Sequence, residues 1–166
     1  MNTIELEDGW AKILPTIDNL VHNLWPEDDK PCGAGKINNE IYIKVFIQVY
    51  NLCNRDQNYS DQLYQRYKDK VEKVFTQNVQ PQIDSASDAE LSMVVKDQWF
   101  RFRIFIKWIS SFFSYLGRSH TKRKGLPSLK ETGYGVFKDH LPQRLSEEII
   151  ATIEEDIAKI ISPSVS

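Results

Sequence analysis

The sequence predicts an all-α fold, built as a bundle of five or more helices. Apolar residues recur at helical spacing in several segments of this 166-residue chain. Capping residues and prolines separate these segments, and none of them requires a β-strand. Successive amphipathic helices bury their apolar faces by packing on one another. We expect one domain over residues 1–161 and a tail over residues 162–166, because a chain of this length can bury its own core.

The first helix is expected within residues 6–24, where apolar residues recur every three or four positions. Pro15 interrupts this segment and predicts a kink or a late start, because proline lacks the N–H that a helix interior needs. A loop rich in turn residues follows at residues 26–35. Asn38 and Asn39 are candidate N-caps for the next helix.

Residues 41–53, IYIKVFIQVYNLC, hold the most informative pattern, with ten apolar residues among thirteen. Local propensity favours a strand, because Ile, Val and Tyr alternate along the segment. The all-helical context favours a helix, which would have an aliphatic face and a second, aromatic face. The aliphatic face holds Val45, Val49 and Leu52, and the aromatic face holds Tyr42, Phe46 and Tyr50, with Ile43 at its edge. One apolar face suffices for docking on the core, so the second predicts deep burial or a partner.

The next two segments are also helical in pattern. Ser60 precedes a helix that is expected to end near Pro81. Ser87 and Glu90 match a capping box, which predicts the start of the longest helix of the chain. This longest helix leaves an apolar arc of roughly 200°, well beyond one docking face. One flank holds Phe102, Phe105, Ile109, Phe113 and Leu116, and the other holds Ile104, Trp108, Phe112 and Tyr115, with Arg101 and Ser111 among them. The helix at residues 41–53 and the longest helix therefore each have more apolar surface than docking on the core requires.

Residues 117–125 are expected to form a basic loop, followed by helices at residues 129–141 and 145–160. The loop could bind nucleic acid through Arg118, His120, Lys122, Arg123 and Lys124. We favour this alternative less, because no aromatic residue interleaves and cations after a helix also suit its dipole. The whole chain has 21 basic and 23 acidic residues, which argues against a surface built for nucleic acid or anionic lipid.

No catalytic, cofactor or metal site is expected. The flexible loop PCGAGK lacks the hydroxyl of a Walker phosphate loop, because Ile37 stands in its place. The three histidines lack a second ligand at metal-binding spacing. Cys53 continues the apolar pattern of its helix and is expected to be a core residue rather than a nucleophile. We therefore expect a protein without enzymatic activity.

Two features of the sequence bear on the cell compartment. The N-terminus is acidic where a secretory signal would be basic and then apolar, and the two cysteines have no C-x-x-C spacing. Both features favour the cytoplasm or the nucleus. Charged residues interrupt the longest apolar segment, residues 99–116, so we expect no membrane span.

Four segments of the chain resemble the first N-terminal repeat of cullins, most closely those of plant SCF-type ubiquitin ligases. They are YIKVFIQVYNLC, YSDQLYQRYK, WFRFRIFIKWISSFFSYLGR and KGLPSLKETGYGVFKDHL, within residues 5–155. The resemblance implies a five-helix cullin repeat, a scaffold module that docks a BTB-fold adaptor through its second and fifth helices. The implied partner is a Skp-type adaptor with its F-box protein. A chain that ends after the first repeat is not expected to bind a RING subunit.

The resemblance also suggests which residues contact the adaptor. Tyr42, Ile43 and Phe46 match family positions on the second helix, and Phe112 and Tyr115 match positions at the adaptor edge. Combined with the two excess apolar faces, the predicted adaptor-binding residues are Tyr42, Ile43, Phe46, Tyr50, Trp108, Ser111, Phe112 and Tyr115. A homodimer that buries the same aromatic residues is the other alternative.

Overall fold

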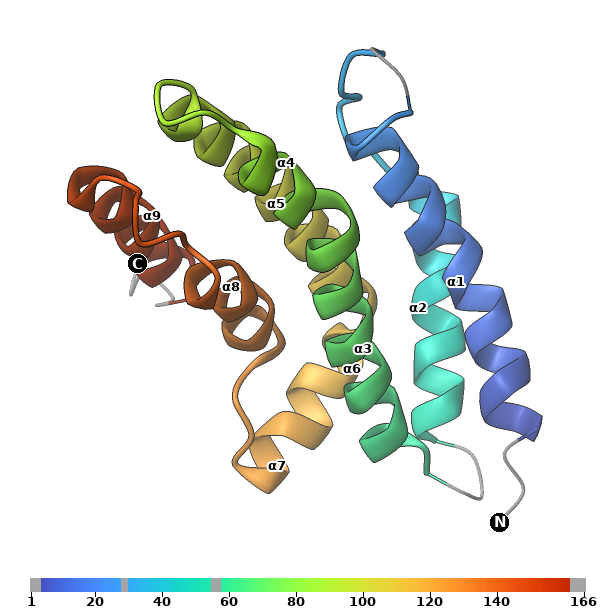
Figure 1. Cartoon of the computed structure of the whole chain (residues 1–166). Coiled ribbons are helices and arrows are strands. Elements are labelled where there is room, and N and C mark those ends of the chain that lie inside the picture. The colour runs from blue at the N-terminus through green and yellow to red at the C-terminus, as the bar shows by residue number, and fades with distance from the viewer. Residues whose placement is uncertain (1–3, 28–29, 55–57, 162–166) are drawn as a thin grey trace.

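The computed structural model describes residues 4–27, 30–54 and 58–161, and the regular structure in these ranges is entirely helical. Nine α-helical stretches and two π-helical turns follow one another there (Figure 1). The all-α prediction is confirmed. Several of these stretches join end to end, which is why they outnumber the five helices that were expected. The predicted tail, residues 162–166, lies outside the described residues.

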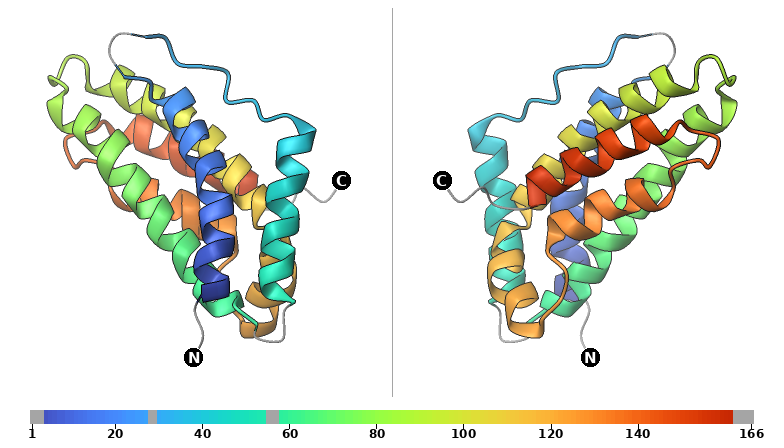
Figure 2. Two further views of the ribbon diagram at one scale, coloured as in Figure 1. Left: turned by 90° about the vertical axis from the view of Figure 1, so that its right-hand side faces the viewer. Right: turned by 90° about the vertical axis from the view of Figure 1, so that its left-hand side faces the viewer.

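The helices α1 (Ile4–Leu24) and α2 (Asn39–Cys53) form an antiparallel pair (Figure 2). The predicted late start at Pro15 is wrong, because α1 is continuous through it. The buried residues of α1 lie on both sides of the proline and hold both halves of the helix on the core. Gly9 permits close packing, since a Cβ at that position would lie only 2.7 Å from a methyl carbon of Leu52.

The predicted helix at residues 41–53 is confirmed, although local propensity favoured a strand. Asn38 is its N-cap, because its side chain accepts a hydrogen bond from the Ile41 N–H at 2.9 Å. Val45, Val49 and Leu52 are all buried, as the helical pattern predicted. Tertiary packing of this aliphatic face outweighs the strand propensity of Ile, Val and Tyr.

The next rod consists of α3 (Ser60–Val74), the π-helical turn η1 (Phe75–Val79) and α4 (Gln80–Ser85). The predicted end near Pro81 is wrong, because the rod continues to Ser85. Pro81 lies in the first turn of α4, where a missing N–H costs least.

The longest rod begins with α5 (Leu91–Phe112) and continues through α6 (Ser114–Leu116), the π-helical turn η2 (Gly117–Thr121) and α7 (Lys122–Lys124). The predicted start at the capping box is wrong. The Glu90 N–H donates to the Ser87 carbonyl in a turn, and the helix begins one residue later. The predicted basic loop is also wrong, because the segment is helical up to Gly125, whose φ of +65° ends it.

Two further helices, α8 (Leu129–Asp139) and α9 (Glu147–Ile161), agree with the prediction. They lie on the opposite side of α5 from α1 and α2, so α5 occupies the centre of the bundle (Figures 1 and 2). The core around α5 is aromatic: Phe75 packs edge-on against Phe102 and Phe137, with ring centroids 5.7 Å apart in both pairs. Within the described residues, each helix lacks the length or the apolar character that a membrane crossing requires.

Candidate partner-binding site

The outer face of α2 exposes several large apolar side chains. Ile43, Ile47 and Tyr50 are 53%, 47% and 45% exposed, respectively. Their spacing of four and three residues places them along one side of the helix, opposite the buried Val45 and Val49. We call Ile43, Ile47 and Tyr50 the apolar stripe. Large aliphatic side chains at this exposure favour a surface that a partner covers.

Beside the apolar stripe, α2 packs against the end of α5. The Tyr42 hydroxyl donates to the Ser111 carbonyl oxygen at 3.2 Å and lies 2.9 Å from the Ser111 Oγ. The Tyr42 ring also packs against Trp108 and Phe112, with centroid distances of 6.3 and 5.8 Å. The aromatic faces of the two helices are therefore neighbours.

The same contact continues on α6. Tyr50 and Tyr115 pack edge to face, with ring centroids 4.9 Å apart. The Tyr115 hydroxyl donates to the Asn54 Oδ1 at 3.1 Å. Phe46 is half-buried and stacks on Tyr42 at 6.4 Å. All eight predicted residues thus lie on or directly below one continuous surface of α2, α5 and α6.

Phe112 differs from the prediction. Phe112 was predicted as an adaptor-binding residue, but its side chain is completely buried beneath Tyr42 and Trp108 and has no surface to offer a partner. The reason is that α2 lies over this part of α5 and covers the ring. Ile47 was missed, although its position four residues after Ile43 was a usable signal.

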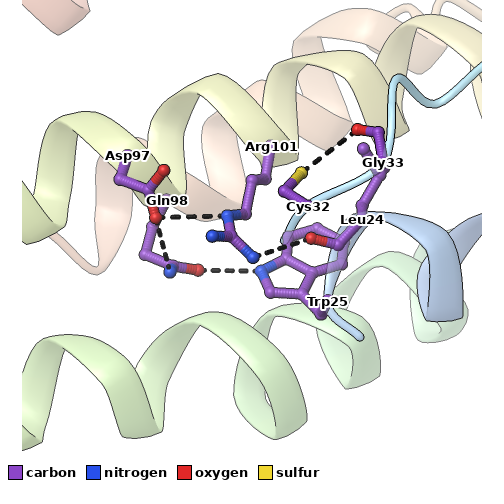
Figure 3. Close-up of polar contacts among 7 residues, drawn as sticks. All are labelled: Leu24, Trp25, Cys32, Gly33, Asp97, Gln98 and Arg101. Atoms are coloured by element: carbon purple, nitrogen blue, oxygen red, sulfur yellow. Dashed lines mark hydrogen bonds and ion pairs between the residues drawn. The ribbon is translucent and has the colours of Figure 1, made fainter. Parts of the chain in front are cut away.

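The loop before α2 is fastened to α5 by polar contacts (Figure 3). Trp25 donates from its indole N–H to the Gln98 Oε1, and the Arg101 guanidinium donates to the Leu24 carbonyl, both at 2.8 Å. Arg101 is also 3.1 Å from the Asp97 carboxylate. These bonds fix the end of α1, where the loop begins.

The predicted basic loop is partly neutralised in the helix that it forms. The buried His120 has its Nε2 3.0 Å from the Asp61 carboxylate, and Lys124 lies 3.3 Å from the same group. Burial lowers the pKa of His120, Asp61 acts to raise it, and the charges of Lys124 and Arg123 lower it further. Two of the five basic residues, His120 and Lys124, therefore face the Asp61 carboxylate, which weakens the nucleic-acid alternative.

Other candidate groups lie within the core. Cys53 is buried, and desolvation raises its thiol pKa although a hydrogen bond with Ser60 acts in the opposite direction. The prediction of a core cysteine is confirmed. In the part of the chain that the structure describes, no three His, Cys, Asp or Glu side chains cluster closely enough to hold a metal ion.

Comparison with known proteins agrees with this helical architecture. The model of the cullin family, described as the cullin alpha solenoid domain, matches residues 10–161. The chain belongs to the cullin family. It is 29% identical over 153 residues to Cullin-1 of Oryza sativa subsp. japonica, covering 91% of this chain and 20% of that protein.

Two shorter relatives come from Arabidopsis thaliana. Putative cullin-like protein 2 is 28% identical, with 92% of this chain and 41% of the relative covered. Cullin-like protein 3 is 25% identical, with 92% and 59% covered. This cullin chain thus spans between a fifth and three fifths of the length of these three relatives. No solved structure matches it.

Proposed function

We propose that this cullin repeat is a non-catalytic, adaptor-binding module of an SCF-type ubiquitin ligase scaffold. It docks a Skp-type adaptor, together with its F-box protein, on α2 and the adjoining ends of α5 and α6. The apolar stripe carries this proposal, because three large apolar side chains of one helix are about half exposed. Membership of the cullin family supports the choice of partner.

The eight predicted residues divide into two groups in this proposal. Ile43 and Tyr50 touch the adaptor directly, together with Ile47. Tyr42, Phe46, Trp108, Ser111 and Tyr115 are half-buried, so they hold α2 in place and contribute their exposed edges, and Phe112 supports them from below.

The energetics of such an interface are favourable. A standard interface buries about 800 Å² on each partner. Each fully covered aliphatic or aromatic side chain contributes roughly 1.5–3 kcal/mol before the costs of association are counted.

The test is calorimetric titration of this chain with a Skp-type adaptor of rice or Arabidopsis thaliana. Ile43→Asp with Ile47→Asp places two charges in the proposed interface and should weaken binding at least about a hundredfold. Both positions are exposed, so the variant should keep its fold, which circular dichroism checks.

Phe100→Asp is the matched control, because Phe100 is 52% exposed on α5, two turns before Trp108. It should bind the adaptor as the wild type does. Absence of wild-type binding, or equal binding by the folded double variant, would contradict the proposed function. A wild-type dimer in light scattering that Ile43→Asp with Ile47→Asp dissolves would instead favour the homodimer alternative.

A further inference from the structure

A groove with a cationic rim lies between α1, α2 and the loop that joins them, on the side of α2 that faces α1. Its volume is about 980 Å³. Lys12, Lys36 and Lys44 line it, and so do the apolar side chains of Ile37, Ile41 and Ile47. The other lining residues are neutral, so no carboxylate lines the groove. It is therefore a positively charged site on a chain whose formal net charge is −2.

The three lysines are largely free to meet an added anion. Lys44 is 3.6 Å from the Glu40 carboxylate, but both side chains are mostly exposed, and an exposed pair of this kind contributes little. Lys12 and Lys36 are also exposed, and within the described residues neither forms an ion pair. An anionic partner would thus replace water rather than an existing internal carboxylate.

The rim is held in place before any ligand arrives. The Asn23 carbonyl accepts from the Gly33 N–H, and the Asn23 Oδ1 accepts from the Gly35 N–H, both at 2.8 Å. The bonds of Trp25 and Arg101 hold the end of α1 from which this loop starts (Figure 3). The two bonds of Asn23 hold the loop just before Lys36 and Ile37. Such preorganisation reduces the entropy lost when a partner binds.

The groove is continuous with the apolar stripe. Ile47 belongs to both, and Ile41, which is 41% exposed, lies at the groove end of α2. This end is also the N-terminus of α2, whose dipole favours negative charge. A partner seated on the apolar stripe could therefore extend a segment into the groove without leaving the surface of α2.

We propose that the groove binds an acidic linear segment of the adaptor that docks on the apolar stripe. This inference rests on the proposed function. Carboxylates of the segment pair with Lys12, Lys36 and Lys44, and its apolar side chains pack on Ile37, Ile41 and Ile47. The lysines select negative charge, and the apolar floor selects a peptide over a small inorganic anion.

The first experiment titrates the Skp-type adaptor into Lys12→Gln with Lys36→Gln at low and at high salt. Affinity should fall about tenfold at low salt, and it should depend less on salt than that of the wild type. Lys73→Gln with Lys138→Gln is the matched control, because it removes the same charge from exposed positions on α3 and α8. The control should bind as the wild type does.

The outcomes separate the two proposals. If the adaptor binds but the Lys12→Gln, Lys36→Gln variant equals the wild type, the groove inference is overturned and the proposed function stands. If both lysine pairs weaken binding equally, only general charge attraction operates, and the groove inference is again overturned. If the wild type does not bind the adaptor, the proposed function fails first.

A second experiment tests the groove without the adaptor. The probe is a fluorescein-labelled peptide of alternating Glu and Leu, and its control has Gln in place of Glu. Fluorescence anisotropy should show binding of the Glu peptide to the wild type and to Ile43→Asp, and weaker binding to Lys12→Gln with Lys36→Gln. Equal binding of the Glu and Gln peptides to the wild type would overturn the chemistry that is proposed for the groove. Equal binding of the Glu peptide to the wild type and to Lys12→Gln with Lys36→Gln would also overturn it.

Discussion

The hydroxyl of Tyr42 on α2 lies 2.9 Å from the Oγ of Ser111 on α5. The same hydroxyl donates to the Ser111 carbonyl oxygen at 3.2 Å. These bonds join the two helices beside the apolar stripe, and they hold Tyr42 half-buried while Ile43 projects from the surface. Tyr42 thus fixes α2 on α5 and places the stripe.

Tyr42→Phe should lower the free energy of unfolding by about 1 kcal/mol, because it removes a hydrogen bond and keeps the ring. Urea denaturation followed by circular dichroism measures this change. Tyr50→Phe is the control: its ring is 45% exposed, and it should change the stability by less than about 0.5 kcal/mol. Equal stability of wild type and Tyr42→Phe would show that the bond to Ser111 is not stabilising.

Phe112→Ala should be far more destabilising, because the side chain is completely buried. Removal of a buried Phe side chain costs about 4 kcal/mol. Thermal unfolding measures the loss. Phe100→Ala changes the same residue type on α5 at an exposed position and should cost less than about 1 kcal/mol. A small cost at Phe112 would mean that the ring is not packed as the structure shows.

Gly35→Ala and Gly135→Ala should have opposite effects on stability. Gly35 has a φ of +64°, and a Cβ there would lie 2.6 Å from a methyl carbon of Ile104, so alanine should destabilise the loop. Gly135 lies within α8, and no atom is within 4 Å of its added Cβ, so alanine should stabilise that helix by about 0.5–1 kcal/mol. Urea denaturation compares the two variants.

The same pair of variants tests the groove. Gly35→Ala should also weaken binding of the Glu-containing peptide, because it disturbs the loop that holds Lys36. Gly135→Ala should leave that binding unchanged. Stabilisation by Gly35→Ala would contradict the strained turn that the structure describes.

His120 should make the protein less stable at acid pH. Its pKa in the folded state is below the ordinary value of 6.5, chiefly because of burial, although Asp61 opposes the shift and Lys124 and Arg123 add to it. The unfolded chain therefore binds the proton more readily. The contribution to stability is present above pH 6.5 and is lost as the pH falls through this value toward the folded pKa.

His120→Gln removes this titration and should flatten the dependence of unfolding free energy on pH in that window. Urea denaturation at a series of pH values gives the comparison with the wild type. Carboxylates elsewhere titrate in both proteins, so the difference between the two curves isolates His120. Parallel curves through the window would show that His120 is not perturbed by folding.

The sequence pattern predicted buried positions correctly where a helix buries one continuous face. The core positions Val45, Val49, Phe105 and Phe113 follow from periodicity, because each helix buries one continuous side. The excess apolar character of α2 was also visible, since ten of thirteen residues cannot all face one core. The helix boundaries were less predictable. Ser87 and Glu90 match the capping-box pattern, yet α5 begins only after them. Pro81 matches the pattern of a helix end, yet it lies in the first turn of α4.

The sequence by itself determined the helical class, the buried faces and the two helices that carry spare apolar surface, because these depend on spacing within one segment. Only the tertiary structure decided that Phe112 lies beneath the surface, since α2 packs over that part of α5. It also decided the cationic groove, which joins Lys12, Lys36 and Lys44 from three separate segments. Contacts between segments depend on how the helices pack, and no local pattern encodes that.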